Sequence, residues 1–198
     1  GLHGFDWMRD LLALGDEDEV GAERLCRETI AGAPKTEEAV DAHLLLADLL
    51  ARRTSVRDAM GVLQGAYRLA GLPARYRAKL AKRLADFARE ADSLAEAIWW
   101  YDEAATLLPS LRDESTYRTA SCYEAGGDIA AALAWYQAIS QPPWGVRGHL
   151  AAAKLLEREE RIQEAQKIYE RLAREPIPEA KMARERLAVL RGEGDDEE

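Results

Sequence analysis

The side chains of this sequence that are best suited to proton transfer are its three histidines, His3, His43 and His149. Histidine titrates near neutral pH and is therefore the commonest general acid or base in enzymes. None of the three stands in a catalytic motif, because the chain contains no H-E-x-x-H, G-x-S-x-G, C-x-x-C or P-loop sequence. Neighbouring carboxylates such as Glu37 and Glu38 stand on an amphipathic helical pattern, where they are typical of solvent-exposed faces. We therefore expect no enzymatic activity, no catalytic residue, no metal site and no cofactor.

A basic stretch between positions 75 and 83 is the second group of side chains with binding chemistry. It contains no acid, in a chain with a formal net charge of -9, and its five basic residues are Arg75, Arg77, Lys79, Lys82 and Arg83. Such side chains bind carboxylates through charge-assisted hydrogen bonds, so the stretch could hold a peptide carboxylate or an acidic partner segment. The acidic C-terminus of the chain itself is an alternative occupant. The excess of acids elsewhere argues against nucleic acid as the main partner.

Composition indicates which elements carry these groups. Of the 198 residues, 47% are hydrophobic and 32% are charged, which is enough apolar surface for a core, and abundant Ala, Leu, Glu and Arg favour helices. No run of 18 apolar residues occurs, so we expect no membrane span. Cys26 and Cys122 fall on the apolar sides of predicted helices. We expect them to be buried free thiols, with a disulfide or a reactive site as the alternatives.

An internal repeat organises the chain. Alanines recur in two aligned positions, twelve residues apart, and a large residue follows the second alanine by four positions: Ala47, Ala85, Ala120 and Ala153; Ala59, Ala97, Ala132 and Ala165; Leu63, Tyr101, Tyr136 and Tyr169. The second alanines are separated by 38, 35 and 33 residues. A fixed helical period in this range predicts an array of helix pairs rather than one globular core.

Helix-capping and helix-breaking residues divide the chain at matching intervals. Thr36, Ser55 and Ser93 are predicted N-caps, and the last two stand in capping-box patterns. We predict one superhelical domain over residues 1–191, with an atypical first pair that includes a helix at 5–14. Its pairs and its capping helix are predicted at residues 5–34, 36–73, 74–109, 112–143, 146–176 and 179–191. The acidic residues 192–198 are expected to be disordered.

These features resemble those of tetratricopeptide repeat (TPR) proteins. Ala97, Tyr101, Ala104 and Pro109 match the family pattern for the second helix of a repeat, and the other repeats match in part. The resemblance covers about residues 36–176. It implies an all-α, right-handed helical-hairpin solenoid of about five helix pairs with a C-terminal capping helix. Its Gly-Asp turn is present only at Gly127-Asp128. His43 and His149 occupy a position that the family fills with bulky packing residues, so packing is their expected role.

In this family the first helices line a concave groove that binds a partner. The resemblance therefore assigns partner binding to positions that carry charges of both signs: Asp41, Leu44, Asp48 and Arg52; Lys79, Lys82, Asp86 and Arg89; Glu114, Tyr117, Ser121 and Glu124; Arg147, Leu150, Lys154 and Arg158. Such a groove is expected to bind an extended or helical peptide through local polar pairs. The alternative for each position is an ordinary solvated helix face.

Four tryptophans have expected roles in packing or binding. Trp99 is predicted near the outer face, either as an exposed interface anchor or beneath a neighbouring helix end. Trp135 corresponds to Trp100, and both are expected to pack between repeats. Trp144 is expected to seal the turn between the fourth and fifth pairs.

The function implied by the resemblance is that of a noncatalytic scaffold or adaptor that binds a protein partner. Self-association into a structural assembly unit stays open as an alternative, and RNA recognition by a helical repeat is a further one, disfavoured by charge. The expected oligomeric state is a monomer or a weak homo-oligomer. The terminal Ala-Arg-Glu-Arg-Leu helix resembles those of bacterial repeat proteins of the cell envelope. Because the chain begins with Gly1, we expect either a cytoplasmic location or envelope association through a missing upstream segment.

Overall fold

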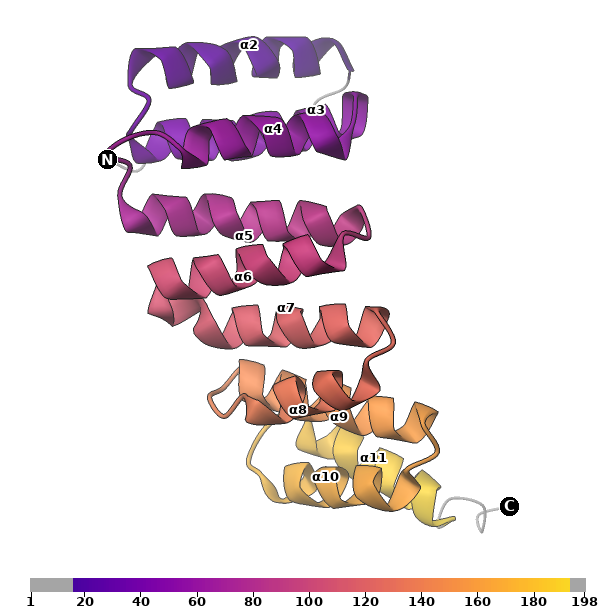
Figure 1. Ribbon diagram of the computed structural model, residues 1–198. Coiled ribbons are helices and arrows are strands. Elements are labelled where there is room, and N and C mark those ends of the chain that lie inside the picture. The colour runs from indigo at the N-terminus through magenta and orange to yellow at the C-terminus, as the bar shows by residue number, and fades with distance from the viewer. Residues whose placement is uncertain (1–15, 193–198) are drawn as a thin grey trace. The chain divides into compact units, whose positions relative to one another are not determined.

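The structure of the protein, a computed structural model, describes residues 16–192, and every regular element within that range is a helix (Figure 1). The elements are α2 (Asp16–Gly32), α3 (Glu37–Arg53), α4 (Val56–Tyr67), α5 (Ala74–Glu90), α6 (Leu94–Leu107), the 3-10 helix η1 (Pro109–Leu111), α7 (Arg112–Ala125), α8 (Ile129–Ala138), α9 (Trp144–Arg158), α10 (Ile162–Arg174) and α11 (Ala180–Arg191). The all-α prediction is confirmed. The helix predicted at 5–14 and the tail at 193–198 lie outside the described residues.

The described part of the chain divides into two units, residues 16–109 and residues 110–192. In the first unit each helix from α2 to α6 packs against the next, and α3 also contacts α5. Cys26 of α2 is completely buried in a cluster with Leu45, Leu46 and Leu49 of α3, and its thiol is free, as predicted. Burial raises the pKa of Cys26 to about 11, so the reactive thiolate is disfavoured.

In the second unit each helix from α7 to α11 packs against the next, and α7 also contacts α9. Its core joins Tyr136 of α8, Leu156 of α9, Tyr169 of α10 and Leu187 of α11. The helix α11 therefore covers the apolar side of α10, where a capping helix was predicted. The single domain over residues 1–191 and its repeat boundaries stay predictions.

Small side chains let the helices of each unit approach closely. All eight alanines of the repeat pattern have a relative exposure of 0%: Ala47, Ala59, Ala85, Ala97, Ala120, Ala132, Ala153 and Ala165. The large residues four positions after the second alanines, Leu63, Tyr101, Tyr136 and Tyr169, are buried as well. The alanine pattern therefore marks the contact surfaces between helices, because a larger side chain there would hold the backbones apart.

Three turns within helix pairs share one backbone conformation. The residues Asp92, Gly127 and Glu160 have positive φ angles of 58°, 79° and 56°. In each turn the next amide donates a hydrogen bond to the carbonyl five residues earlier, at 2.8, 2.9 and 2.8 Å. This is the pattern that commonly ends a helix with a left-handed residue, for which glycine is favoured. The backbone conformation of the Gly127-Asp128 turn therefore also occurs at Asp92 and Glu160, which are not glycines.

Two of the three predicted N-caps are confirmed. The Thr36 hydroxyl accepts a hydrogen bond from the Ala39 amide at 3.3 Å, and the Ser55 hydroxyl accepts one from the Asp58 amide at 3.1 Å. The capping box predicted at Ser93 is wrong, because the Ser93 side chain makes no capping hydrogen bond. Ser93 nevertheless occupies the N-cap position of α6.

The prediction that Trp135 packs between repeats is also wrong. Its relative exposure is 42%, and its ring stacks on Tyr123 of the same helix pair at a centroid distance of 6.3 Å. Trp100 is buried because Tyr67 of the preceding pair meets it edge to face at 5.2 Å. The equivalence of the two positions in sequence therefore does not extend to their packing.

The close approach of α8 and α9 depends on Gly148. A β-carbon added at Gly148 would lie 2.6 Å from the carbonyl oxygen of Tyr136, whose backbone cannot give way easily. We expect Gly148→Ala to lower the free energy of unfolding by about 1–3 kcal/mol, measured by thermal unfolding. The control is Gly65→Ala in α4, where an added β-carbon meets nothing within 4 Å. That variant should be unchanged or gain about 0.5–1 kcal/mol, and equal effects of the two variants would contradict the packing.

Candidate functional site

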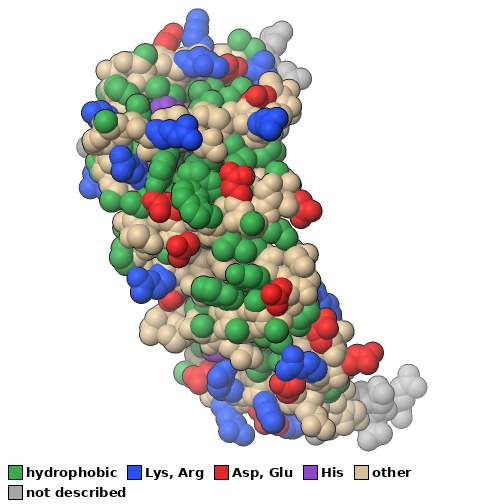
Figure 2. Space-filling model, viewed as in Figure 1, with side chains coloured by type: hydrophobic (Ala, Val, Ile, Leu, Met, Phe, Trp, Pro, Cys, Tyr) green, Lys and Arg blue, Asp and Glu red, His purple; other side chains and the backbone are tan. Residues whose placement is uncertain are grey.

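The sixteen groove positions assigned from the sequence lie on α3, α5, α7 and α9, the first helices of the described pairs. Twelve are half-buried, and Arg52, Arg147, Lys154 and Arg158 are exposed. A residue that borders a groove is expected to have this partial exposure, although a solvated helix side gives the same result. Basic and acidic side chains are interspersed on the face shown in Figure 2.

In the first unit, two residues of the basic stretch on α5 form ion pairs with acids. The Lys79 ammonium lies 2.8 Å from Glu37 and 3.7 Å from Asp41, both on α3. The Arg83 guanidinium lies 2.7 Å from Asp48 of α3 and 3.3 Å from Glu90 of its own helix. The ion pairs with α3 connect adjacent helix pairs. They also leave the stretch less positive than its sequence suggests.

Two further arginines of this stretch lie on tyrosine rings. The Arg75 guanidinium is 4.6 Å from the centre of the Tyr76 ring, and the Arg77 guanidinium is 5.8 Å from that of Tyr67. Arg77 also donates a hydrogen bond to the Leu69 carbonyl at 3.4 Å. Because intramolecular contacts already engage these cations, an acidic segment would have to compete for them.

In the second unit, five of the assigned positions line one open depression. It has a volume of about 500 Å³ and is bordered by Tyr117, Ser121, Glu124, Ala125, Tyr136, Ala151, Lys154 and Arg158. The helix pair α7–α8 supplies one side, and α9 supplies the other. The sequence placed Tyr117, Ser121 and Glu124 on α7 and two basic residues on the next first helix. It did not assign Tyr136 to the groove, because the alanine pattern marks that tyrosine as a core residue.

Aromatic rings form one wall of this depression. The Tyr117 ring lies 5.4 Å from the ring of Tyr136 and 5.3 Å from that of Trp144, the first residue of α9. The Arg147 guanidinium lies over the Trp144 ring, 4.7 Å from its centre. The predicted role of Trp144 at the junction of two pairs thus places it beside the groove.

Glu124 is already engaged by two donors. It accepts a hydrogen bond from the Tyr136 hydroxyl at 2.7 Å, and the Arg158 guanidinium lies 2.8 Å away. Burial, together with this carboxylate, raises the pKa of Tyr136, so its hydroxyl stays protonated. Lys154, by contrast, has no carboxylate within ion-pairing distance among residues 16–192. Its ammonium is therefore the charge most available to a ligand here.

A second depression continues from the same two basic residues. It has a volume of about 600 Å³ and is bordered by Lys154, Glu157, Arg158, Ile162, Tyr169, Met182, Arg186 and Leu190. Glu157 repeats the arrangement of Glu124, since it accepts a hydrogen bond from the Tyr169 hydroxyl at 2.6 Å and pairs with Arg186. Lys154 and Arg158 thus border both depressions, and α11 supplies a far side that the sequence did not assign.

The other assigned positions do not join this site. In the second unit, Leu150 packs against the buried core and Glu114 lies 3.9 Å from Arg118. In the first unit, Asp86 accepts a hydrogen bond from the Tyr101 hydroxyl at 2.6 Å, and Arg52 lies 3.1 Å from Glu19. The partner-binding role of the positions on α3 and α5 stays a prediction.

Trp99 of α6 is exposed, with a relative exposure of 56%. Its ring contacts the buried Trp100 edge to face at 4.5 Å. The sequence left open whether this ring is exposed or lies beneath a neighbouring helix end, and the structure shows that it is exposed. Its role as an interface anchor stays a prediction.

Residues 16–192 contain no group of His, Cys, Asp and Glu side chains arranged to hold a metal ion. Over the same range, no helix combines the length and apolar character that crossing a bilayer requires. His43 is buried and contacts the Ala39 carbonyl at 2.7 Å, which agrees with a packing role.

Comparison with known proteins reveals similarity in structure only. No protein-family model and no curated protein sequence matches this chain. A crystal structure of MamA is 20% identical, with a TM-score of 0.61, covering 87% of this chain and 92% of that one. The TPR-like repeats of a kinesin light chain from Podospora anserina are 15% identical, with a TM-score of 0.61 over 91% and 89% of the two chains. BtubC (BKLC) from P. vanneervenii is 16% identical, with a TM-score of 0.58 over 90% and 83%. The TPR-type helical-repeat fold predicted from the sequence is confirmed.

The pairing of Glu157 predicts a pH dependence of stability. The hydrogen bond from Arg186, and then that from Tyr169, hold the pKa of Glu157 below its usual value near 4.5. A lowered carboxyl pKa stabilises the fold above pH 4.5, and this contribution disappears as the pH falls through the lowered pKa. Thermal unfolding from about pH 7 to about pH 3 should show Glu157→Gln less stable by about 1 kcal/mol at neutral pH, with the difference shrinking below pH 4.5.

The control for this experiment is Glu185→Gln on α11. The Glu185 carboxylate is exposed and lies 3.7 Å from Lys181. This exposed pair should contribute little at any pH. A constant difference between wild type and Glu157→Gln across the pH range would contradict the assigned role of the Glu157 carboxylate.

Proposed function

We propose that this protein is a noncatalytic interaction module that binds a segment of a protein partner along its first helices. The observation that carries the proposal is the depression beside Lys154, where five positions assigned independently from the sequence meet. The adjoining depression extends the bordered surface to α11. TPR-type folds generally serve as protein-interaction scaffolds, and the fold similarity is consistent with that use.

The chemistry of the site favours a segment that carries a carboxylate beside an aromatic or aliphatic side chain. The unpaired Lys154 ammonium would bind the carboxylate, and Arg158 can turn toward it because 60% of its side chain is exposed. The rings of Tyr117 and Tyr136, which border the depression, offer an apolar wall for the neighbouring side chain. Glu124 and Glu157 disfavour a highly acidic segment, so a few spaced carboxylates are preferred over a continuous acidic run.

The first unit would add a second, more polar region of the same kind. Its positions on α3 and α5 include Lys79 and Asp41, which pair with each other across adjacent helices. A partner there would exchange one ion pair for another, which contributes to specificity more than to affinity.

Peptide selection followed by a charge reversal tests the proposal. Short peptides selected from a displayed random library should be enriched in carboxylates spaced from aromatic or aliphatic residues. Fluorescence anisotropy should then show that Lys154→Glu weakens their binding by about tenfold or more, because attraction becomes repulsion. The matched control is Lys167→Glu on α10, which lines neither depression. Selected peptides that bind wild type and Lys154→Glu equally would exclude this site.

The exposure of Trp99 favours one alternative function, self-association through the outer face of α6. In that case, sedimentation velocity should show a sedimentation coefficient that rises with protein concentration. Trp99→Ala should abolish this rise, whereas Trp135→Ala, which removes another exposed tryptophan, should leave it unchanged. A sedimentation coefficient that does not rise with concentration in the wild-type protein would exclude this alternative.

A further inference from the structure

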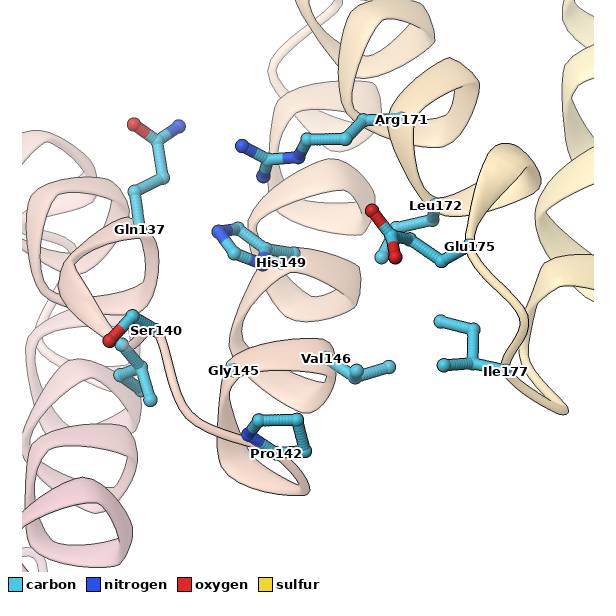
Figure 3. Close-up of a pocket in the computed structure, with 11 residues that line it drawn as sticks. Gln137, Ser140, Pro142, Gly145, Val146, His149, Arg171, Leu172, Glu175 and Ile177 are labelled. Carbon is cyan, nitrogen blue, oxygen red and sulfur yellow. The ribbon is translucent and has the colours of Figure 1, made fainter.

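A third depression in the second unit lies away from the positions assigned to the groove. It is bordered by the end of α8, the first half of α9, the end of α10 and the connections that follow α8 and α10 (Figure 3). Its volume of about 440 Å³ is within the usual range of small-molecule sites, about 300–1,000 Å³. None of the residues that border it belongs to the sixteen positions assigned to partner binding.

The base of this depression is apolar. Ile139 and Leu172 are buried, whereas Val146 and Ile177 are half-buried and leave part of their surface open. Gly145 permits this arrangement, because an added β-carbon would lie 2.9 Å from the Ser140 carbonyl carbon. These four branched aliphatic side chains thus border an open space. Such a surface favours a small aliphatic group.

One wall carries two opposite charges that do not pair with each other. Arg171 and Glu175 stand four positions apart on α10 and its C-terminal cap, and in Figure 3 Arg171 extends over α9 toward His149, whereas Glu175 lies beside Leu172. Among residues 16–192 neither forms an ion pair. Their order contributes to this, because an acid that follows a base by four positions pairs less well than the reverse order.

The polar groups around these charges are neutral donors and acceptors. Gln137 and Ser140 border the depression at the end of α8, and His149 borders it from α9. Burial and the nearby Arg171 charge lower the pKa of His149, so its ring is neutral at physiological pH. The ionised groups that border the site are therefore one guanidinium and one carboxylate.

This charge pattern disfavours ligands with a single sign of charge. An anion would interact with Arg171 but would be repelled by Glu175, and a cation would meet the opposite conflict. A zwitterion satisfies both charges at once, and an aliphatic group on the same molecule would cover the apolar base. A free aliphatic α-amino acid combines these three groups within the size of the depression.

We propose that the depression between α8, α9 and α10 binds a free aliphatic α-amino acid of the size of leucine. Arg171 binds the α-carboxylate and Glu175 binds the α-ammonium group. The side chain lies against Ile139, Val146, Leu172 and Ile177. A peptide end is a poorer ligand, because a C-terminal residue lacks the ammonium group and an N-terminal residue lacks the carboxylate.

Isothermal titration calorimetry of the full chain with L-leucine tests this inference. We expect a dissociation constant of about 1 mM or lower. Acetyl-leucine and leucinamide, which mimic the two peptide ends, should each bind at least about tenfold more weakly, because each leaves either Arg171 or Glu175 without an oppositely charged group on the ligand. L-Glutamate should bind more weakly for lack of an aliphatic group. Absence of L-leucine binding at about 10 mM, or binding of leucinamide or acetyl-leucine as tight as that of L-leucine, would overturn the proposal.

Two variants and one matched control complete the test. Arg171→Gln and Glu175→Gln should each weaken L-leucine binding by about tenfold or more, while circular dichroism shows an unchanged fold. Arg174→Gln removes a neighbouring basic residue of α10 that does not line the depression, and it should leave the affinity unchanged. Binding that is unaffected by Arg171→Gln, or weakened equally by Arg174→Gln, would place the ligand elsewhere and overturn the proposal.

Discussion

A hydrogen bond from a tyrosine hydroxyl to a carboxylate recurs in three helix pairs and links the core to the groove. The pairs are Tyr101 with Asp86 at 2.6 Å, Tyr136 with Glu124 at 2.7 Å, and Tyr169 with Glu157 at 2.6 Å. Each tyrosine ring is buried beside an alanine of the repeat pattern, and its hydroxyl reaches a residue on the first helix. The bond satisfies a hydroxyl that would otherwise be costly to bury. It also commits one groove carboxylate of each pair to an internal partner.

This commitment changes the balance of charge that the groove presents. The chain as a whole is acidic, with a formal net charge of -9, yet Glu124 and Glu157 are engaged by tyrosines and arginines. Lys154 keeps an ammonium without a carboxylate partner in the described residues. The local surface is therefore more positive than the sequence average. Net charge describes solubility and long-range attraction, whereas recognition depends on which charges remain unpaired.

The sequence predicts the fold well because the fold depends on local and periodic features. The alanines at fixed spacing mark close helix contacts, and the Thr36 and Ser55 hydroxyls cap helices through backbone amides three residues away. Both features act over short distances along the chain. The pattern of residues places Ser93 correctly at the start of α6, but it does not reveal whether the hydroxyl turns toward a backbone amide.

The candidate sites were harder to predict because they join residues that are far apart in sequence. The ion pair of Arg83 with Asp48 spans 35 positions, and its existence depends on how two helices are rotated about their axes. Trp100 and Trp135 occupy equivalent positions, yet only the first has an aromatic neighbour that buries it. The depression beside Arg171 was missed entirely, since its residues come from three helices and two connections and share no motif.

The turns at Asp92, Gly127 and Glu160 have a consequence for how such proteins diverge. Two of the three residues accept a left-handed conformation without glycine, at a penalty of about 1 kcal/mol each, because the surrounding hydrogen bonds enforce it. A hairpin can therefore lose its most recognisable residue while its path through space is preserved. The sequence pattern of a repeat can therefore be lost at a turn while the fold of the helix pair is kept.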